Sequence, residues 1–276
     1  MGQDLLEAYL SRGMNQVQGW LDSFSARAIA AVVRDQQRLG LTGAVGEIGV
    51  HHGRLFILLY LLSAPQERAF AVDVFSDQTR NVDESGRGNE AIFLSNLSRH
   101  AGGSERVELF ACDSNQLRPE DIKSRVGRCR LISVDGGHTA DTTENDLRLA
   151  DALLIEGGVC ILDDYFNPMW PDVSAGAARY FLSPGIRLHP FLITPDKLFL
   201  TAGEGDAEEY LAVMARMFPW RRSGENAMYG RKVAIYGIDP PDLAGRMQRR
   251  LAQGPLRPLL RPVYHRLRRM MQRGQA

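Results

Sequence analysis

Short apolar runs recur along the chain and alternate with helix-compatible stretches, and this rhythm constrains the fold more than any other feature. Each run is four to seven residues long and rich in branched or aromatic side chains, which is typical of β-strands. The predicted strands cover residues 44–48, 69–75, 107–111, 130–134, 159–162, 197–201 and 233–236. Because intervening helices imply parallel pairing with both faces covered, the sequence predicts an α/β fold with a doubly wound, mostly parallel, seven-stranded sheet.

The residues before the first predicted strand are expected to be helical. Apolar side chains recur at helical spacing over residues 4–12 and 18–38, and helices are also expected over residues 54–63 and 90–99. A length of 276 residues with 44% hydrophobic content suffices for one large core. The predicted division is an N-terminal helical cap at residues 1–40, a central domain at residues 41–240 and a basic C-terminal tail at residues 241–276.

Charge is distributed unevenly, although the formal net charge is zero. The segment from Leu243 to Ala276 contains nine arginines and no acid, which leaves the rest of the chain at −9. Such a tail can bind an anionic membrane surface, an acidic partner or the acidic body of the same chain, or it can stay solvated. No nucleic-acid partner is predicted, because basic residues cluster only at this end and no binding motif accompanies them.

No segment predicts export or membrane insertion. Residues 1–13 carry acids and lack the apolar core of a signal peptide, and no stretch reaches the roughly 18 apolar residues of a membrane span. The three cysteines lie in or beside apolar runs without metal-ligand spacing, which is typical of a reduced protein: Cys112, Cys129 and Cys160. We expect a cytoplasmic protein, with peripheral contact to the inner membrane surface through the tail as an alternative. Self-association as a homo-oligomer remains open.

Glycines and acids follow the first three predicted strands. In doubly wound sheets, ligands bind beyond the carboxyl ends of the strands. Gly49 and Gly53 bracket the turn after the first strand, Asp73 ends the second strand, and Asp113 and Ser114 follow the third. Three such ends on one rim favour a nucleoside site, although each residue could also serve a tight turn or a helix cap.

The residues Glu47, Gly49 and Gly53 form an E-x-G-x-x-x-G pattern, which resembles motif I of class I S-adenosylmethionine-dependent methyltransferases. The pattern departs from the G-x-G-x-x-G of dinucleotide enzymes, whose glycines serve a pyrophosphate. The resemblance covers about residues 43–201 and implies a Rossmann-like methyltransferase fold.

The resemblance also implies a place for each part of the cofactor, S-adenosylmethionine. Glu47 and the glycine loop would border the methionine end. Asp73 would hold the ribose, and Asp113 with Ser114 would flank the adenine.

Three acids and a histidine follow the fourth and fifth predicted strands. Asp135 and His138 belong to a D-G-G-H segment, and Asp163 and Asp164 end the fifth strand. Because both strands end on one rim, the three carboxylates and the imidazole can converge. No Lys or Arg lies in either segment, so their repulsion predicts a divalent cation, with Mg²⁺ favoured and Mn²⁺ or Ca²⁺ as alternatives. A helix cap at Asp135 and a solvated turn at the acid pair are the other interpretation.

The D-G-G-H segment, followed 28 residues later by D-D-Y, resembles the metal-dependent O-methyltransferases that act on macrolide sugars, of the mycinamicin and macrocin type, and related glycan O-methyltransferases. The resemblance implies that Asp135, Asp163 and Asp164 bind Mg²⁺, that His138 is the general base and that Asp135 takes part in catalysis. Because a sugar hydroxyl is a poor nucleophile, a base and a metal suit its methylation, and chelation favours a vicinal diol.

Residues near these acids are candidate acceptor contacts. Tyr165, Asn167 and Trp170 follow the acid pair, where they could form a wall for a sugar face or pack the loop onto the core. His52 in the glycine loop is a further candidate. The polar segment 78–93 predicts a loop that could close over the cofactor.

Methylation of a sugar hydroxyl in a glycoside, natural product or glycan is therefore the predicted function. A catechol or phenol O-methyltransferase is the alternative within the same chemistry, since vicinal phenolic oxygens chelate the same metal. From other classes, a nucleotide-sugar or dinucleotide oxidoreductase or a non-catalytic nucleotide-binding protein on the same fold remains open.

Overall fold

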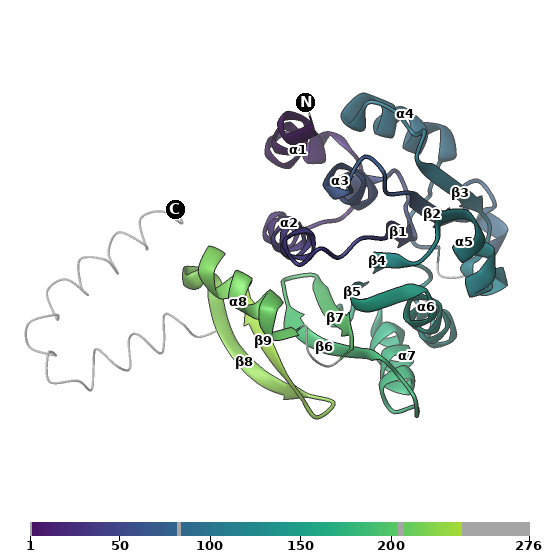
Figure 1. Ribbon diagram of the computed structural model, residues 1–276. Helices are drawn as coiled ribbons and strands as arrows, with labels where there is room; N and C mark the ends of the chain where they lie inside the picture. Colours follow the sequence, from purple (N-terminus) through teal and green to yellow (C-terminus); the bar gives the residue numbers. More distant parts are fainter. Residues whose placement is uncertain (1, 82–83, 204–206, 239–276) are drawn as a thin grey trace, which may run out of the picture. The chain divides into compact units, whose positions relative to one another are not determined.

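The computed structural model describes residues 2–81, 84–203 and 207–238 (Figure 1). The described residues up to Gly237 belong to one compact unit, so the N-terminal helices share a core with the sheet. The predicted basic tail, residues 241–276, lies outside the described residues. The predicted domain boundaries therefore stay predictions.

Within the described residues, nine strands form one sheet in the order β3-β2-β1-β4-β5-β7-β6-β9-β8. Strands β1 to β5 pair in parallel, β7 runs antiparallel to both neighbours, and the β8–β9 hairpin extends the sheet beyond β6. The strands are β1 (Ala44–Ile48), β2 (Ala69–Asp73), β3 (Val107–Ala111), β4 (Cys129–Val134), β5 (Leu154–Asp163), β6 (Leu188–Ile193), β7 (Lys197–Ala202), β8 (Arg222–Met228) and β9 (Arg231–Tyr236).

The α/β class and the mostly parallel, doubly wound sheet are confirmed, but the predicted number of seven strands is wrong. Strand β6 was missed because Pro190 interrupts its apolar run, and the sheet absorbs the proline in an irregularity between Pro190 and Leu192. Strand β8 was missed because its residues are polar and largely exposed, so only pairing with β9 makes it a strand.

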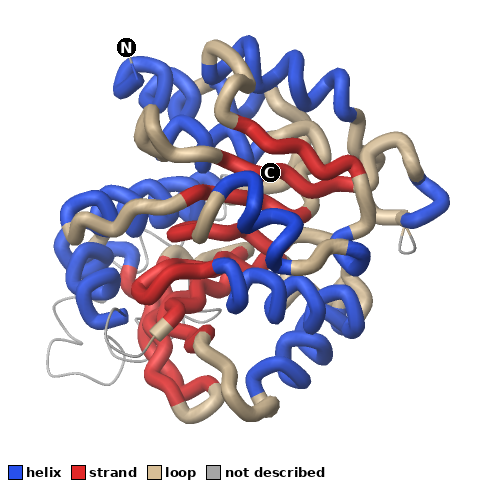
Figure 2. The backbone as a smooth tube through the Cα atoms, turned by 45° about the vertical axis from the view of Figure 1, so that its right-hand side comes forward, coloured by secondary structure: helices blue, strands red, loops and turns tan. Residues whose placement is uncertain are grey.

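Helices cover both faces of the sheet (Figures 1 and 2). In Figure 1, α2, α3 and α8 lie on one face, and α5, α6 and α7 lie on the other. The helices are α1 (Gly2–Ser11), α2 (Ser23–Arg38), α3 (Arg54–Leu62), α4 (Glu90–Ala101), α5 (Pro119–Val126), α6 (Ala140–Leu153), α7 (Pro171–Phe181) and α8 (Ala207–Met217), with the 3₁₀ turns η1 (Gly13–Gln16), η2 (Gln78–Arg80), η3 (Ser114–Gln116) and η4 (Pro219–Arg221). In the part of the chain that is described, no helix combines the length and apolar character needed to cross a membrane.

The start of α2 differs from the prediction, which began this helix at residue 18. The Asp22 carboxylate accepts hydrogen bonds from the backbone N–H groups of Phe24 (2.8 Å) and Ser25 (3.1 Å), so it caps the helix and leaves residues 18–22 outside it. The backbone N–H of Asp22 donates to Asp196 Oδ2 (2.8 Å), in the turn between β6 and β7. This cap thereby fixes the N-terminal segment across the end of the sheet that carries the site.

Candidate active site

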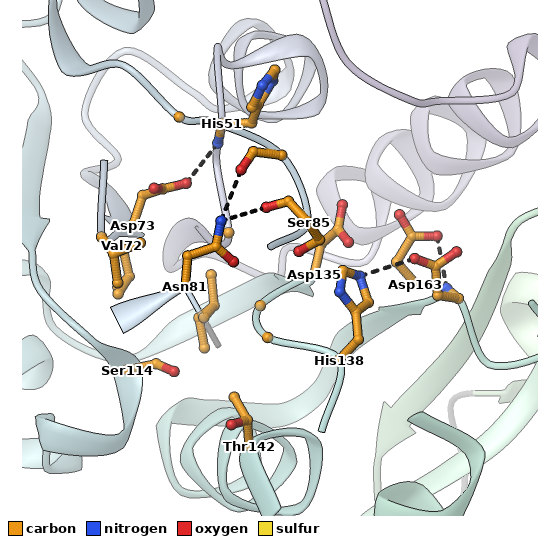
Figure 3. Close-up of a pocket in the computed structure, with 18 of the residues that line it drawn as sticks. His51, Val72, Asp73, Asn81, Ser85, Ser114, Asp135, His138, Thr142 and Asp163 are labelled. Atoms are coloured by element: carbon orange, nitrogen blue, oxygen red, sulfur yellow. Dashed lines mark hydrogen bonds and ion pairs between the residues drawn. The ribbon is translucent and has the colours of Figure 1, made fainter. Parts of the chain in front are cut away.

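The carboxyl ends of the parallel strands open onto a cavity of about 500 Å³ (Figure 3). Most of the residues predicted for the site line this cavity: Gly49, Asp73, Asp113, Ser114, Asp135, His138, Asp163, Asp164, Asn167 and Trp170. The other predicted residues are not among its lining: Glu47, His52, Gly53 and Tyr165. The residues predicted for the cofactor and for the metal therefore face one common space.

Gly49 brings the ends of β1 and β4 together. Its backbone has φ 87°, and a Cβ at this position would collide with the carbonyl oxygen of Asp135. The backbone N–H of Asp135 donates to the carbonyl of Ile48 (2.8 Å), which ties the two strand ends. The glycine is thus required by the packing that positions Asp135, independently of any ligand.

Glu47 in β1 and Gly53 at the end of the glycine loop are not among the residues that line the cavity. Gly53 precedes α3 with φ 89°, and Phe93 packs where its side chain would be. Glu47 is buried, and burial raises the pKa of its carboxyl well above the usual range, with Lys197 opposing the shift. Glu47 Oε2 has no hydrogen-bond partner among the described residues. Its predicted place near the methionine end stays a prediction.

Asp73 is held at the end of β2 by the loop after β1. Its Oδ2 accepts the backbone N–H of His51 (2.7 Å), and its Oδ1 accepts that of Phe75 (2.6 Å). Burial raises the pKa of Asp73, and these N–H groups oppose the increase. Close to Asp73, Asn81 Nδ2 donates to the carbonyls of Ser85 (2.8 Å) and Gly86 (2.9 Å), as Figure 3 shows. Described residues of the predicted 78–93 loop therefore form a wall next to Asp73, although closure of this loop stays a prediction.

Asp113 does cap a turn, as the alternative interpretation held. Its Oδ1 accepts the backbone N–H of Asn115 at the start of η3 (2.9 Å). Both Asp113 and the buried Ser114 nevertheless line the cavity, opposite Thr142 of α6. Asp113 can both cap η3 and line the cavity, because this turn lies at the carboxyl end of β3, where the cavity opens.

Asp135, His138 and Asp164 converge. One donor atom from each lies within 4.8 Å of the others, and His138 Nε2 is 3.1 Å from Asp164 Oδ2. Burial alone would raise the pKa of Asp164, but hydrogen bonds from His138 and from Asn167 Nδ2 (2.8 Å) lower it. The His138 ring stacks on Trp170, with ring centroids 4.3 Å apart and an interplanar angle of 14°. The imidazole is therefore held both at its edge and on its face.

The repulsion predicted among these acids is offset by a basic residue from outside their two segments. Lys197, the first residue of β7, is fully buried, and its Nζ forms an ion pair with Asp163 Oδ2. Burial would lower the pKa of Lys197, but the carboxylates of Asp163, Asp135 and Asp196 raise it, so the ammonium stays charged. Sequence reasoning missed this partner because β7 follows β5 by more than 30 residues and pairs with it antiparallel.

The predicted acceptor contacts divide into two groups. Asn167 and Trp170 line the cavity, whereas Tyr165 is buried and hydrogen-bonds Tyr229 through the two hydroxyls (2.9 Å). His52 is also buried and lies outside the lining, and its neighbour His51 faces the cavity instead. Tyr165 thus helps to hold the loop onto the core, as the alternative interpretation expected.

Trp20 lines the cavity although sequence reasoning gave it no role. Its side chain is 70% exposed, and its ring lies 5.5 Å from that of His51. Arg54 fixes the segment by donating to the Gly19 carbonyl (2.8 Å) and to Asn15 Oδ1 (3.1 Å). An exposed tryptophan on an anchored segment is a candidate ligand contact.

The donor chemistry of the converging group fits a divalent cation. Asp135 and Asp164 offer carboxylate oxygens, and His138 offers a ring nitrogen. Burial raises the pKa of Asp135 well above its usual range, and the neighbouring Asp163 adds to this, so a cation at its oxygens would favour the ionised form. Hard oxygen donors suit Mg²⁺, which keeps several of its waters.

Comparisons with known proteins agree with this architecture. Residues 47–165 match the family model described as a methyltransferase domain. Among solved structures, the O-methyltransferase NovP is 18% identical, with a TM-score of 0.54, and the match covers 65% of this chain and 81% of NovP. An O-methyltransferase from Bacillus cereus, solved in complex with SAH, is 14% identical, with a TM-score of 0.51 and coverage of 73% and 91%. At such identities the structural likeness shows the fold, and no curated protein matches the sequence.

Asp146 lies behind the cavity wall without facing the cavity. It is a fully buried residue of α6, and a Cβ on Gly136 would meet its Oδ2 at 2.5 Å. Burial raises the pKa of this carboxyl to about 7. The D-G-G-H loop therefore rests on an acid that is largely protonated below neutral pH.

Asp146→Asn should raise the melting temperature at pH 8 and change it little at pH 4. The carboxyl titrates near pH 7 when folded, against an ordinary value of 3.8. Between these values the unfolded chain releases the proton while the folded chain keeps it, so wild-type stability falls as pH rises, by at most about 4 kcal/mol. Calorimetric unfolding from pH 4 to 8 measures this difference, with Asp141→Asn, whose side chain is 90% exposed on the same helix, as the control. Parallel profiles for wild type and Asp146→Asn would contradict it.

Proposed function

We propose that this protein is an Mg²⁺-dependent O-methyltransferase that transfers the methyl group of S-adenosylmethionine to a sugar hydroxyl. The match to a methyltransferase domain and the fold shared with NovP support this proposal. The acceptor would be a glycoside, a natural product or a glycan. One observation carries the proposal: the cavity that contains Gly49, Asp73 and Asp113 also contains the group of Asp135, His138 and Asp164. Donor and acceptor chemistry would thus meet in one space.

The cofactor half of the cavity suits a nucleoside without phosphates. Asp73 would accept hydrogen bonds from ribose hydroxyls, and the η3 turn at Asp113 and Ser114 would border the adenine. The methionine part would lie beside Gly49 and His51, toward the acids at the end of β4 and β5. The family match over residues 47–165 supports this cofactor.

Of the three acids predicted to hold Mg²⁺, or Mn²⁺, which are Asp135, Asp163 and Asp164, the first and the last converge with His138, and their carboxylate oxygens would bind the ion. When bound, such an ion supplies Lewis-acid chemistry that acidifies an acceptor hydroxyl and favours a vicinal diol. His138 would accept the hydroxyl proton, and Asp164, next to its Nε2, would stabilise the imidazolium that forms. The stacked ring of Trp170 would fix the orientation of the imidazole during transfer of the methyl group to the acceptor oxygen.

The acceptor would enter between two aromatic residues. Trp20 on the N-terminal segment and Trp170 beside His138 both line the cavity. Indole rings suit the apolar face of a sugar, and Asn167 adds a polar side chain to the same wall. The same flat surfaces would also accommodate a phenol, so a catechol O-methyltransferase is the second candidate.

We expect S-adenosylhomocysteine to bind the purified protein with micromolar affinity, and NAD not to bind, because the glycine loop lacks a pyrophosphate site. Calorimetric titration in Mg²⁺ and again in EDTA measures this. The affinity should change little on removing the metal, since the acids lie at the acceptor end. Absence of binding in both buffers would eliminate the cofactor on which the proposal rests.

His138→Ala should reduce methyl transfer to a glycoside by about 10²–10⁴-fold, and transfer to a catechol by much less, because a phenol ionises more easily. Initial rates with both acceptor classes, under saturating cofactor, measure the ratio. Binding of S-adenosylhomocysteine and of Mg²⁺ should stay near the wild-type values. An almost unchanged glycoside rate would contradict the assignment of the base, and a loss of Mg²⁺ binding would make His138 a ligand instead.

Trp20→Ala should raise the KM for a glycoside acceptor by about tenfold, as expected when an aromatic stacking surface is removed. Affinity for S-adenosylhomocysteine should stay within a factor of about two, and Trp20→Phe should restore most of the loss. Trp220→Ala is the matched control, since Trp220 is 76% exposed in η4 and is not among the cavity lining. A loss of affinity for S-adenosylhomocysteine with an unchanged KM for the glycoside would instead show that Trp20 contacts the cofactor.

A further inference from the structure

Lys197 places an ammonium group inside the acidic end of the site, in an ion pair with Asp163. Its side chain is completely buried, and Asp163 is its cross-strand partner in the antiparallel pairing of β7 with β5. The charges of Asp135 and Asp196 also act on the ammonium, and the buried Glu47 is influenced by it in turn. The positive charge of Lys197 thus reduces the repulsion among several buried carboxyls.

Asp163 differs from Asp164 in what its oxygens already contact. Asp163 Oδ2 pairs with Lys197, Oδ1 accepts the backbone N–H of Asp164 (2.9 Å), and the carboxyl also shares a hydrogen bond with that of Asp135. The Asp163 side chain is 7% exposed, against 21% for Asp164. One carboxylate oxygen of Asp164 instead lies within 4.8 Å of donor atoms of Asp135 and His138. Adjacent acids therefore face different partners, because Asp163 is the last residue of β5 whereas Asp164 follows the strand with a left-handed backbone (φ 58°).

We propose that Lys197 withholds Asp163 from the metal, so that the protein offers a divalent ion two carboxylates, those of Asp135 and Asp164. This inference rests on the proposed function, because it concerns the ion of that site. Asp163 then acts as a positioning residue: it fixes the Asp164 backbone through Oδ1 while the lysine neutralises its charge. A site with two carboxylates leaves room for waters and for a chelating acceptor on Mg²⁺.

The lysine also makes the folded site independent of the metal. Removing one partner of a buried ion pair leaves an uncompensated charge, whereas replacing both partners with neutral groups is often tolerated. Without Lys197, Asp163 would become a third carboxylate near the ion, and metal binding would increase because it would then relieve the repulsion. The charge of Lys197 therefore determines how many carboxylates coordinate the ion.

The decisive variant is the neutral pair Lys197→Met with Asp163→Asn. We expect its dissociation constants for Mg²⁺ and Mn²⁺ to stay within about threefold of wild type, since neither residue contacts the ion. Lys197→Met alone should bind about tenfold more tightly, and its melting temperature should fall in EDTA and recover with Mg²⁺. Asp164→Asn should lose at least about tenfold in metal affinity while retaining S-adenosylhomocysteine binding.

The measurements are calorimetric titrations with MgCl₂ and with MnCl₂, together with thermal unfolding, and none requires an acceptor. Lys232→Met is the matched control, because Lys232 is an exposed lysine that pairs with Glu225 on the β8–β9 hairpin. If Lys197→Met does not fold, the neutral pair still decides the question. A loss of tenfold or more in the neutral pair would make Asp163 a ligand and overturn this inference alone. Failure of the wild type to bind either ion would overturn the metal role together with it.

Discussion

The ion pair between Lys197 and Asp163 is the interaction on which the chemistry of this site depends. Carboxyls at the ends of β1, β4 and β5 are crowded into a space with little water, where like charges repel strongly and ionised groups are costly. The buried ammonium offsets that repulsion from within the fold. The hydrogen bonds from His138 and Asn167 lower the pKa of Asp164, and the charge of Lys197 adds to their effect.

Backbone geometry then decides which side chains meet. Gly49 lets the loop after β1 lie against the carbonyl of Asp135, and a side chain there would push β4 away from the cavity. Asp164 has φ 58°, a left-handed conformation that Asp tolerates better than most residues, and its side chain accepts a hydrogen bond from Asn167. These constraints act at short range, but their result is a common cavity lined by Asp73, Asp135 and Asp164.

The segment before β1 contributes Trp20 to the cavity wall, in addition to the residues at the ends of the strands. Asp22 begins α2 and is tied to Asp196, while Arg54 holds the preceding turn at Gly19. As a result Trp20 lines the cavity from outside the parallel strands, next to His51. The cavity wall is thus assembled from segments that precede and follow the region matched by the family model, as well as from that region itself.

Much of the fold could be predicted from local pattern. Apolar runs located the parallel strands, and the rule that their carboxyl ends share a rim brought Asp73, Asp113, Asp135 and Asp164 to one cavity. Periodicity could not find β6, with its proline, or the polar β8, because pairing rather than composition makes them strands. By itself, then, the sequence determined the fold class, the rim and the acids on it, since these follow from spacing along one chain. Only the tertiary structure decided that Lys197 neutralises Asp163 and that Trp20 reaches the cavity, because both contacts join segments far apart in the chain whose register depends on the packed sheet.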